Sequence, residues 1–597
     1  VDLSNIAQAI FVPSPGTNVN GSAPALGYTA EDAANKQNSL VVDGTAAKYP
    51  TVDAVNNAIN SIDVNKVNYV DISNDKATLI TSGSATVSNL EDLTFTVSNR
   101  YRNVELDASQ PFINLNFKKQ KSTHFVNKIF ENGADNLILT NTVDGLKFTN
   151  NSGARISAHY MVPGSTATPS VNFSIRVKKE TSEHRVGISF IKDINNFILY
   201  FNDINTVTGI NIVSKNAGVT TGLYSSTSSI TTGSYGLNMN WANSKIAAFT
   251  KVSDLVTYRA TVTPTISNIQ NPSNYRSFRP AIYLDLENGE SVTIESFSAG
   301  YSDGVGHADF KSVTYENGEP IFENGKFFVT SSSRLMGENG GSGMIAVYEI
   351  DRLTFQVKVR SFISVSKSNV VESGTAAKIV YDRTISKWIY IARAFPSPGG
   401  RLHLGIVTEN LLGSGIHVIP VTEMTGLATN SLDADLFKEN GIWYIGYHGG
   451  TGTRTLRIAK STNLTTWTEI VNQSSGEGIA FARYNGKWWI LDARSATQMG
   501  VSLFDTSLET VVFSDFLVLP DNPGILAGTA GYPWGCFVPY FRGDRTEYYL
   551  VVFTMDKYID GMSDIFSYGD MWIYNTVETS IGVGEFFQQE NFLIKGY

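Results

Sequence analysis

In the C-terminal half, the hydrophobic residues recur as pairs of short apolar runs joined by a tight turn. In residues 476–491 an apolar run at 479–481 is followed by Asn485-Gly486 and by a second run at 488–491. Asn-Gly accepts the positive φ angles of a two-residue hairpin, so this stretch predicts two antiparallel strands. Glu477 precedes the first strand and is therefore expected at the mouth of the unit.

The same unit occurs five times between residue 303 and the C-terminus. The copies are residues 307–333, 376–394, 431–450, 476–491 and 535–554. Their spacing of roughly forty to sixty-five residues is typical of propeller blades. Five blades close into a ring, which removes exposed sheet edges and places the first strand of each blade around a central channel. We therefore predict a five-bladed β-propeller over residues 303–597.

The chain before the propeller is also expected to be mostly strand. Residues 126–302 contain nine or so strand-like runs without helical periodicity, which predicts a β-sandwich of the jelly-roll type. This strand pattern resembles the laminin-G and concanavalin-like modules, many of which bind sugars. A carbohydrate-binding module and a structural spacer are both compatible with it. Residues 66–125 alternate in short runs and predict a small β domain or a shaft.

The first 65 residues differ from the rest in their pattern. Thr51 can cap a helix in which Val52, Val55, Ile59 and Ile62 follow heptad spacing. Two heptads fit either a short trimerisation seam or one locally packed amphipathic helix. We thus expect a mainly β protein with a short helical N-terminal connector.

Composition removes several classes of function. The net charge of -9 opposes nucleic-acid binding, which requires clustered Lys and Arg. The single cysteine, Cys536, cannot form an intrachain disulfide and is expected to be a small core residue. No apolar run reaches the length of a membrane span, and no secretory signal is visible at the N-terminus.

Three acids occupy comparable positions in the blade repeats: Asp309, Asp433 and Glu477. Each alone could cap a turn or pair with an arginine. Because a propeller brings the starts of its inner strands together, three such acids favour a shared site. Glu316 and Glu319 compete with Asp309, since they lie nearer the hairpin of the first blade.

These residues carry a resemblance to a known family. Asp309 in HADF, Asp433 in LDADLF and Glu477 in GEGI, together with STNLTTW at 461–467, resemble the five-bladed glycoside hydrolases of the arabinanase and xylosidase type. The resemblance implies an inverting hydrolase with Asp309 as general base, Glu477 as general acid and Asp433 tuning the acid. Phe310 and Ala434 depart from that family, which has proline after each aspartate.

Other candidate residues are weaker. Trp443, Trp488, Tyr532 and Trp534 could stack on sugar rings, although blade packing explains them equally well. Arg494 could bind an acidic sugar or neutralise a channel acid. His448, in a glycine-rich loop, is a further candidate for substrate contact. We expect no cofactor and no metal site, although the hydrolases that the chain resembles sometimes hold an axial calcium ion.

The N-terminal sequence shows a second resemblance. Residues 27–59, GYTAEDAANKQNSLVVDGTAAKYPTVDAVNNAI, resemble the connector phrase of bacteriophage tail fibres and tailspikes. This implies a homotrimeric virion protein whose N-terminus binds other tail or baseplate proteins and which acts outside the cell. Three functions stay open: a tail protein that binds and cleaves bacterial surface polysaccharide, a non-catalytic adhesin for a glycan or protein receptor, and a secreted bacterial polysaccharide hydrolase.

Overall fold

The computed structural model describes most of the chain from residue 89 onward and four short strands before it. The described residues are 36–37, 49–50, 67–73, 76–81, 89–101, 110–119, 125–164, 170–179, 185–203, 209–227, 230, 233–242, 245–253, 255–266, 272–303, 306–334, 342–367, 370–395, 400–450, 455–474, 476–494, 498–507, 509–520, 534–542, 545–553 and 571–576. Within these ranges no helix has the length and apolar character that a bilayer crossing needs.

The chain divides into two compact units, which are described separately. The first contains residues 1–88 with two C-terminal segments, 540–547 and 577–597. In it, β1 (Lys36–Gln37) pairs in parallel with β2 (Tyr49–Pro50), and β3 (Val67–Ser73) forms an antiparallel hairpin with β4 (Lys76–Thr81). The expected helix that contains Val52 to Ile62 lies outside the described residues.

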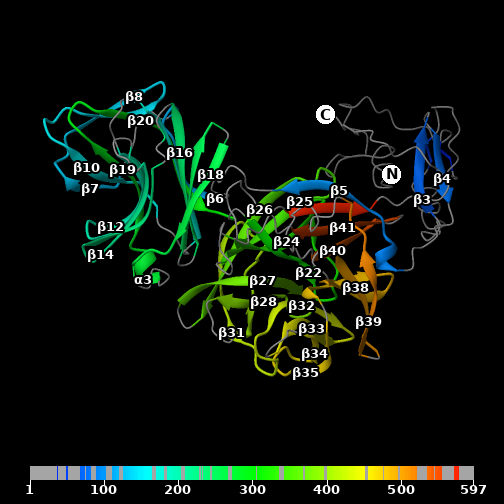
Figure 1. Cartoon of the computed structure of the whole chain (residues 1–597). Coiled ribbons are helices and arrows are strands. Elements are labelled where there is room, and N and C mark those ends of the chain that lie inside the picture. The colour runs from blue at the N-terminus through cyan, green and yellow to red at the C-terminus, as the bar shows by residue number, and fades with distance from the viewer. Residues whose placement is uncertain are drawn as a thin grey trace, which may run out of the picture. The chain divides into compact units, whose positions relative to one another are not determined.

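The second unit begins with a β-sandwich, as the strand pattern predicted. One sheet has the order β15-β14-β13-β12-β19-β10-β7, and the other β18-β17-β16-β11-β20-β9-β8, with β6 also paired to β20 (Figure 1). The strands are β6 (Gln110–Asn116), β7 (Asn127–Asn132), β8 (Leu137–Thr142), β9 (Gly145–Asn150), β10 (Ile156–Met161), β11 (Ser170–Lys179), β12 (Arg185–Asp193), β13 (Asn196–Asp203), β14 (Ile210–Asn216), β15 (Val219–Ser226), β16 (Ser234–Ala242), β17 (Lys245–Val252), β18 (Leu255–Val262), β19 (Arg279–Leu286) and β20 (Ser291–Tyr301). The single turn of helix α3 (Pro272–Tyr275) precedes β19.

The core of the sandwich lies between the two sheets. Phe173, Ile175 and Val177 of β11 pack inward with Phe190 and Trp241 from β12 and β16. Alternate residues of β11 therefore point away from this core, because successive side chains of a strand face opposite sides. That outer face is polar and is considered below.

The propeller has the five blades that the repeats predicted. Each blade starts with an inner strand: β21 (Gly306–Ser312), β27 (Val370–Asp382), β32 (Leu432–Glu439), β36 (Glu477–Tyr484) and β40 (Gly535–Arg542). The outer strands are β24 (Lys326–Arg334), β25 (Ser342–Asp351) and β26 (Val357–Lys367) in the first blade; β28 (Lys387–Phe395), β29 (Leu402–Val407) and β31 (Thr422–Glu423) in the second; β33 (Ile442–Gly449), β34 (Thr455–Ser461) and β35 (Thr468–Gln473) in the third; β37 (Lys487–Ala493), β38 (Met499–Asp505) and β39 (Thr510–Leu517) in the fourth; and β41 (Arg545–Phe553) with β42 (Met571–Thr576) in the fifth. Three short strands lie off these blade paths: β23 (Phe322–Glu323) pairs with β24, β22 (Thr314–Tyr315) pairs in parallel with β27 of the second blade, and β30 (Gly415–Pro420) pairs in parallel with β26 of the first blade.

The outermost strand of the last blade comes from a segment that precedes the sandwich in the sequence. Its sheet has the order β40-β41-β42-β5, where β5 is Phe95–Tyr101. The sandwich is thus inserted between the closing strand and β21. The segment 66–125, expected as one small domain, is divided: β5 belongs to the propeller and β6 to the sandwich.

The hairpins and interblade cores follow the sequence closely. Asn324, Asn440 and Asn485 all have φ between 50° and 52°, and the glycine after each is also positive, as a type I′ turn requires. The aromatic second strands then pack between blades. Trp388 lies in the cluster between the first two blades, Trp443 in the next one and Trp488 in the one after that.

Candidate active site

The inner strands of the first four blades contain a β-bulge at the same place. The pairing with the second strand slips by one residue after Ala308, Thr375, Leu432 and Glu477. The first bulge residue in each blade is in the left-handed region: Asp309 (φ 61°), Ala376 (φ 51°), Asp433 (φ 57°) and Gly478 (φ 75°). Asp309 and Asp433 are therefore structurally equivalent, and Glu477 is one residue before the equivalent position.

The left-handed conformation at the bulges explains why aspartate stands at 309 and 433 and glycine at 478. A left-handed conformation costs an ordinary L-residue about 1–2 kcal/mol, and glycine and aspartate adopt it most readily. Bulges also re-aim side chains next to active sites. Asp309 and Asp433 are 6% and 5% exposed, whereas Glu477 is exposed. The chain thus holds two nearly buried carboxylates and one accessible carboxylate at corresponding ends of inner strands.

Lys311 connects the two equivalent aspartates. Its Nζ donates a hydrogen bond to the backbone carbonyl of Asp433 at 3.1 Å, although the two residues belong to the first and third blades. Burial and the charge of Lys378 lower the pKa of Lys311, and the negative charges of Asp435, Asp433 and Asp309 only partly offset them. Asp309 and Asp433 therefore lie within electrostatic reach of one ammonium group.

A buried ion pair lies beside this group. Lys378 Nζ is 3.0 Å from Asp435 Oδ1, and both side chains are 3% exposed or less. Lys378 also donates to the carbonyl of Ser312 at 2.9 Å, and Asp435 Oδ2 accepts the backbone N–H of Phe481 at 2.9 Å. One cluster thus links the inner strands of the first four blades. Burial among these charges raises the pKa of the Cys536 thiol to about 12.

A calcium ion does not fit this cluster. Two ammonium groups, those of Lys311 and Lys378, already lie among its carboxylates, and they repel a cation. Among the residues that the structure describes, no three His, Cys, Asp or Glu side chains are grouped as metal ligands.

The surroundings of Glu477 are set by a glycine and an indole. A Cβ added to Gly478 would lie 2.3 Å from the ring of Trp534, so the glycine backbone packs directly on this ring. Lys311 Nζ is 4.6 Å from the centroid of the same indole, which is 3% exposed. Trp534 thereby joins the acidic end of the fourth blade to the lysine cluster.

Glu316 and Glu319 are held elsewhere. Lys438, at the far end of β32 from Asp433, donates its backbone N–H to the carbonyl of Glu316. The Arg383 guanidinium binds Glu316 at 2.9 Å and Glu319 at 3.4 Å. Burial alone would raise the pKa of Glu316, but the hydrogen bonds from Arg383 hold it below its usual value. Both glutamates are thus at the opposite end of the inner strands, and Asp309 remains the acid of the first blade.

The other sequence candidates are placed as follows. Trp443 and Trp488 are 3% and 4% exposed within interblade cores, and Phe437 stacks on Trp488 with ring centroids 3.6 Å apart. His448 is buried on β33 opposite Leu432, next to the third bulge. Tyr532 lies outside the described residues.

Arg494 and His307 each have defined partners. Arg494 donates a bidentate pair of hydrogen bonds to Asp492, from Nε to Oδ1 at 3.0 Å and from Nη2 to Oδ2 at 2.8 Å. It therefore neutralises a fully buried acid opposite the fourth bulge. His307 Nδ1 is 3.0 Å from the hydroxyl of Tyr348, which donates to Asp303 at 2.8 Å.

Sequence reasoning missed the lysine cluster. Lys311, Lys378 and Asp435 all stand two residues after the bulge residue of their blade. Aligning the repeats ADFK, TAAK and LDAD would have exposed this position as one that carries charge in three consecutive blades.

The fold and the site define a mainly β protein whose five-bladed propeller gathers carboxylates around its inner strands. No family model matches the chain, and the search of curated proteins found no match. Among solved structures, the chain is similar to a GH43 beta-xylosidase/alpha-arabinofuranosidase from a compost microbial metagenome, in complex with xylotriose. That match has 13% identity and a TM-score of 0.32, and covers 45% of this chain and 91% of that chain.

Two further solved structures broaden the comparison. A GH43 enzyme from Xanthomonas citri has 11% identity and a TM-score of 0.33, over 47% of this chain and 89% of that chain. The carbohydrate-binding module CBM66 from Bacillus subtilis has 10% identity and a TM-score of 0.22, over 30% of this chain and 99% of that chain. These likenesses concern shape alone, and the functional argument rests on the carboxylates and their neighbours.

Proposed function

We propose that the propeller binds a polysaccharide and hydrolyses its glycosidic bonds with Asp309, Asp433 and Glu477. The observation that carries the proposal is the shared bulge. It gives Asp309 and Asp433 equivalent positions near one lysine, and it places Glu477 one residue before the same position in the next blade. Nearly buried acids such as Asp309 and Asp433 are costly unless they serve chemistry or structure, and Glu477 adds an accessible carboxylate at the corresponding end of its inner strand.

In the proposed reaction, Glu477 donates its proton to the glycosidic oxygen while the bond from that oxygen to the anomeric carbon breaks. Asp309 takes a proton from a water molecule, and the water oxygen bonds to the anomeric carbon from the opposite face. Such inverting pairs are separated by roughly 6.5–9.5 Å, which leaves room for the water. Asp433 orients the acid.

We also propose that the protein acts as a bacteriophage tail fibre or tailspike on bacterial surface polysaccharide. Support comes from the connector phrase at residues 27–59. The N-terminus would then bind other tail or baseplate proteins, and the chain would be a homotrimer. Light scattering before and after deletion of residues 1–65 tests this: a trimer that becomes a monomer supports it, and a monomer in both samples contradicts it.

The catalytic proposal is tested by turnover. The protein is incubated with a panel of bacterial capsular and cell-wall polysaccharides, with xylan and arabinan alongside, and newly formed reducing ends are measured. Glu477→Gln and Asp309→Asn should each lower the rate by about 10²-fold or more, because each removes a proton-transfer group.

Glu316→Gln is the matched control. It removes a carboxylate from the same propeller, but one that binds Arg383 at the other end of the strands. It should keep the parent rate. Loss of activity in Glu316→Gln equal to that in Glu477→Gln would refute the assignment.

A non-catalytic adhesin is the second candidate. The ammonium group of Lys311 lies within electrostatic reach of both Asp309 and Asp433, as in a cluster of charges that stabilises a fold. If the parent binds host cells but releases no reducing ends from any polysaccharide, the propeller is an adhesin.

A further inference from the structure

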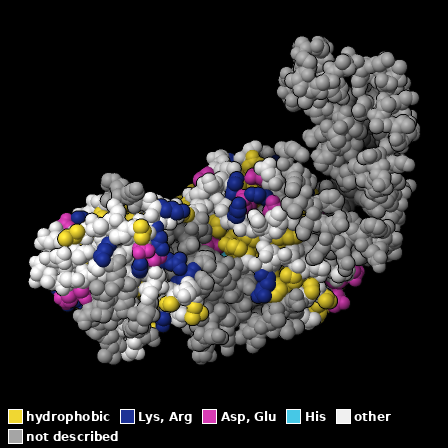
Figure 2. All heavy atoms as spheres, turned by 90° about the horizontal axis from the view of Figure 1, so that it is seen from above, with side chains coloured by type: hydrophobic (Ala, Val, Ile, Leu, Met, Phe, Trp, Pro, Cys, Tyr) yellow, Lys and Arg dark blue, Asp and Glu magenta, His cyan; other side chains and the backbone are white. Residues whose placement is uncertain are grey.

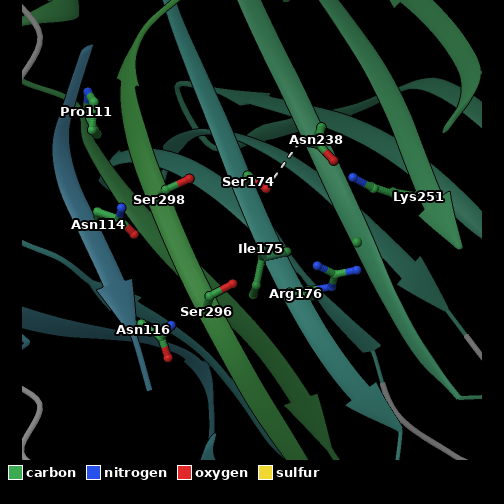
Figure 3. Close-up of a pocket in the computed structure, with 11 residues that line it drawn as sticks. Pro111, Asn114, Asn116, Ser174, Ile175, Arg176, Asn238, Lys251, Ser296 and Ser298 are labelled. Atoms are coloured by element: carbon green, nitrogen blue, oxygen red, sulfur yellow. Dashed lines mark hydrogen bonds between the residues drawn. The ribbon is translucent and has the colours of Figure 1, made fainter. Parts of the chain in front are cut away.

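A polar groove of about 350 Å³ crosses the outer face of the eight-stranded sandwich sheet. Its side chains come from five neighbouring strands, β6, β20, β11, β16 and β17 (Figure 3). Five strands about 5 Å apart give the groove a length of roughly 19 Å. It is therefore long enough for an extended chain.

The lining residues are aligned in two rows across the strands. One row is Asn116, Ser296, Arg176, Gly236 and Lys251, each paired with the next in the sheet register. The second row is Asn114, Ser298, Ser174 and Asn238, where Asn238 donates to Ser174 Oγ at 3.1 Å. The groove thus presents amide, hydroxyl and cationic groups at a regular spacing.

Gly236 opens the floor of the groove between its two cations. It stands between Arg176 and Lys251 in the first row and carries no side chain to fill the space. The side chain of Arg176 is 48% exposed. Glu295 lies in the bulge next to Arg176. Its Oε2 is 3.0 Å from Lys118 Nζ and 4.0 Å from Arg176 Nε, so both cations offset its charge.

The lining favours one chemical class of ligand. Of its eleven residues none is acidic and none is aromatic, while two are cationic and six are Asn or Ser. Single-stranded nucleic acid requires aromatic platforms for its bases and a continuous basic track. The chain has a net charge of -9, and in the described part of the face in Figure 2 the Lys and Arg side chains are interspersed with other types.

We propose that this groove binds an acidic polysaccharide chain, with its carboxylates at Arg176 and Lys251 and its hydroxyls at the Asn and Ser rows. This is a second glycan site, on a different domain from Asp309, Asp433 and Glu477, and it does not depend on hydrolysis by the propeller. It would hold an anionic polymer by charge and hydrogen bonds without ring stacking.

The test is affinity electrophoresis of the full chain in gels that contain alginate or polygalacturonate, with dextran as the neutral polymer. Arg176→Ala with Lys251→Ala should weaken binding to both polyuronates about tenfold or more, since two charge-assisted contacts are lost. Lys192→Ala with Lys215→Ala, on β12 and β14 of the other sheet, removes the same charge and should leave binding unchanged.

Two further arms locate and identify the site. Glu477→Gln should bind polyuronate like the parent, because it leaves the groove intact. Added salt should weaken the binding, since exposed charges are screened. Equal affinity in the two double variants, equal affinity for dextran, or binding to single-stranded DNA in place of polyuronate would each overturn the proposal.

Discussion

Lys311 of the first blade donates a hydrogen bond to the backbone carbonyl of Asp433 in the third blade at 3.1 Å. The side chain that makes this contact is fully buried, and Asp433 stands at a left-handed bulge. The same lysine is thus part of the packing of the propeller and of the electrostatic environment of its candidate acids. Stability and activity are therefore expected to respond together when this cluster is changed.

The buried pair of Lys378 and Asp435 tests how much this cluster contributes to stability. Lys378→Met should lower the free energy of unfolding by about 3–5 kcal/mol, because it leaves a buried carboxylate without its cation. Replacing both residues, as Lys378→Met with Asp435→Leu, should recover most of the loss. Urea unfolding followed by tryptophan fluorescence measures both values.

Lys326→Met is the control for that experiment. Lys326 Nζ pairs with Glu349 at 2.6 Å, but the lysine is 33% exposed, and its removal leaves Glu349 with a second cation, Arg360, whose Nη1 is 3.5 Å away. Its loss should cost about 1 kcal/mol or less. If Lys326→Met lowered the free energy of unfolding as much as Lys378→Met, burial of the ion pair would not be the cause of the large loss.

The lowered pKa of Lys311 predicts a pH dependence of stability. In the unfolded chain this lysine titrates near its ordinary value of 10.5, above its folded value, so the unfolded state binds more protons between the two. Stability contributed by this group therefore rises with pH in that window. The parent should therefore gain stability relative to Lys311→Met as the pH rises toward 10.5.

The comparison with the variant isolates Lys311 from other groups. Cys536, whose raised pKa makes stability fall at high pH, is present in both proteins, and below pH 9.0, the ordinary pKa of a thiol, it stays mostly protonated in the folded and the unfolded state. A difference between parent and variant that stays constant or shrinks with rising pH would contradict the account.

Closure of the ring by β5 predicts the effect of two truncations. Deleting residues 1–88 leaves the strand that pairs with β42, whereas deleting residues 1–101 removes it. The second deletion should lower the melting temperature by about 5 °C or more and promote aggregation. It exposes the edge of β42 and removes the buried side chain of Phe95. Scanning calorimetry with light scattering distinguishes the two; identical melting would refute closure by this strand.

Gly478 offers a test of the wall beside Glu477. Gly478→Ala meets both a positive φ and the Trp534 ring at 2.3 Å, while Gly486→Ala meets a positive φ with nothing within 4 Å. The Gly486 variant should cost about 1 kcal/mol and keep activity. The Gly478 variant should cost more and lower turnover, because Trp534 must shift next to the acid. Equal effects on stability and activity would contradict this role.

Much of the architecture followed from local pattern. Asn-Gly turns in three blades, together with the aromatic second strands, predicted the blade repeat because turn chemistry and hairpin pairing are local. The assignment of β5 to the last blade was not accessible, since its partner Met571–Thr576 lies more than four hundred residues away. The acids were found by their repeat position, while Lys311 and Lys378 were missed because lysine is normally exposed and a buried one looks like surface in the sequence.

The most direct test of the central claim is the anomeric configuration of the first product, followed by proton NMR on whichever polysaccharide the protein cleaves. The account predicts an inverted sugar, formed by the parent and by Glu316→Gln but not by Glu477→Gln or Asp309→Asn. A retained configuration, or cleavage that persists in Glu477→Gln, would contradict it.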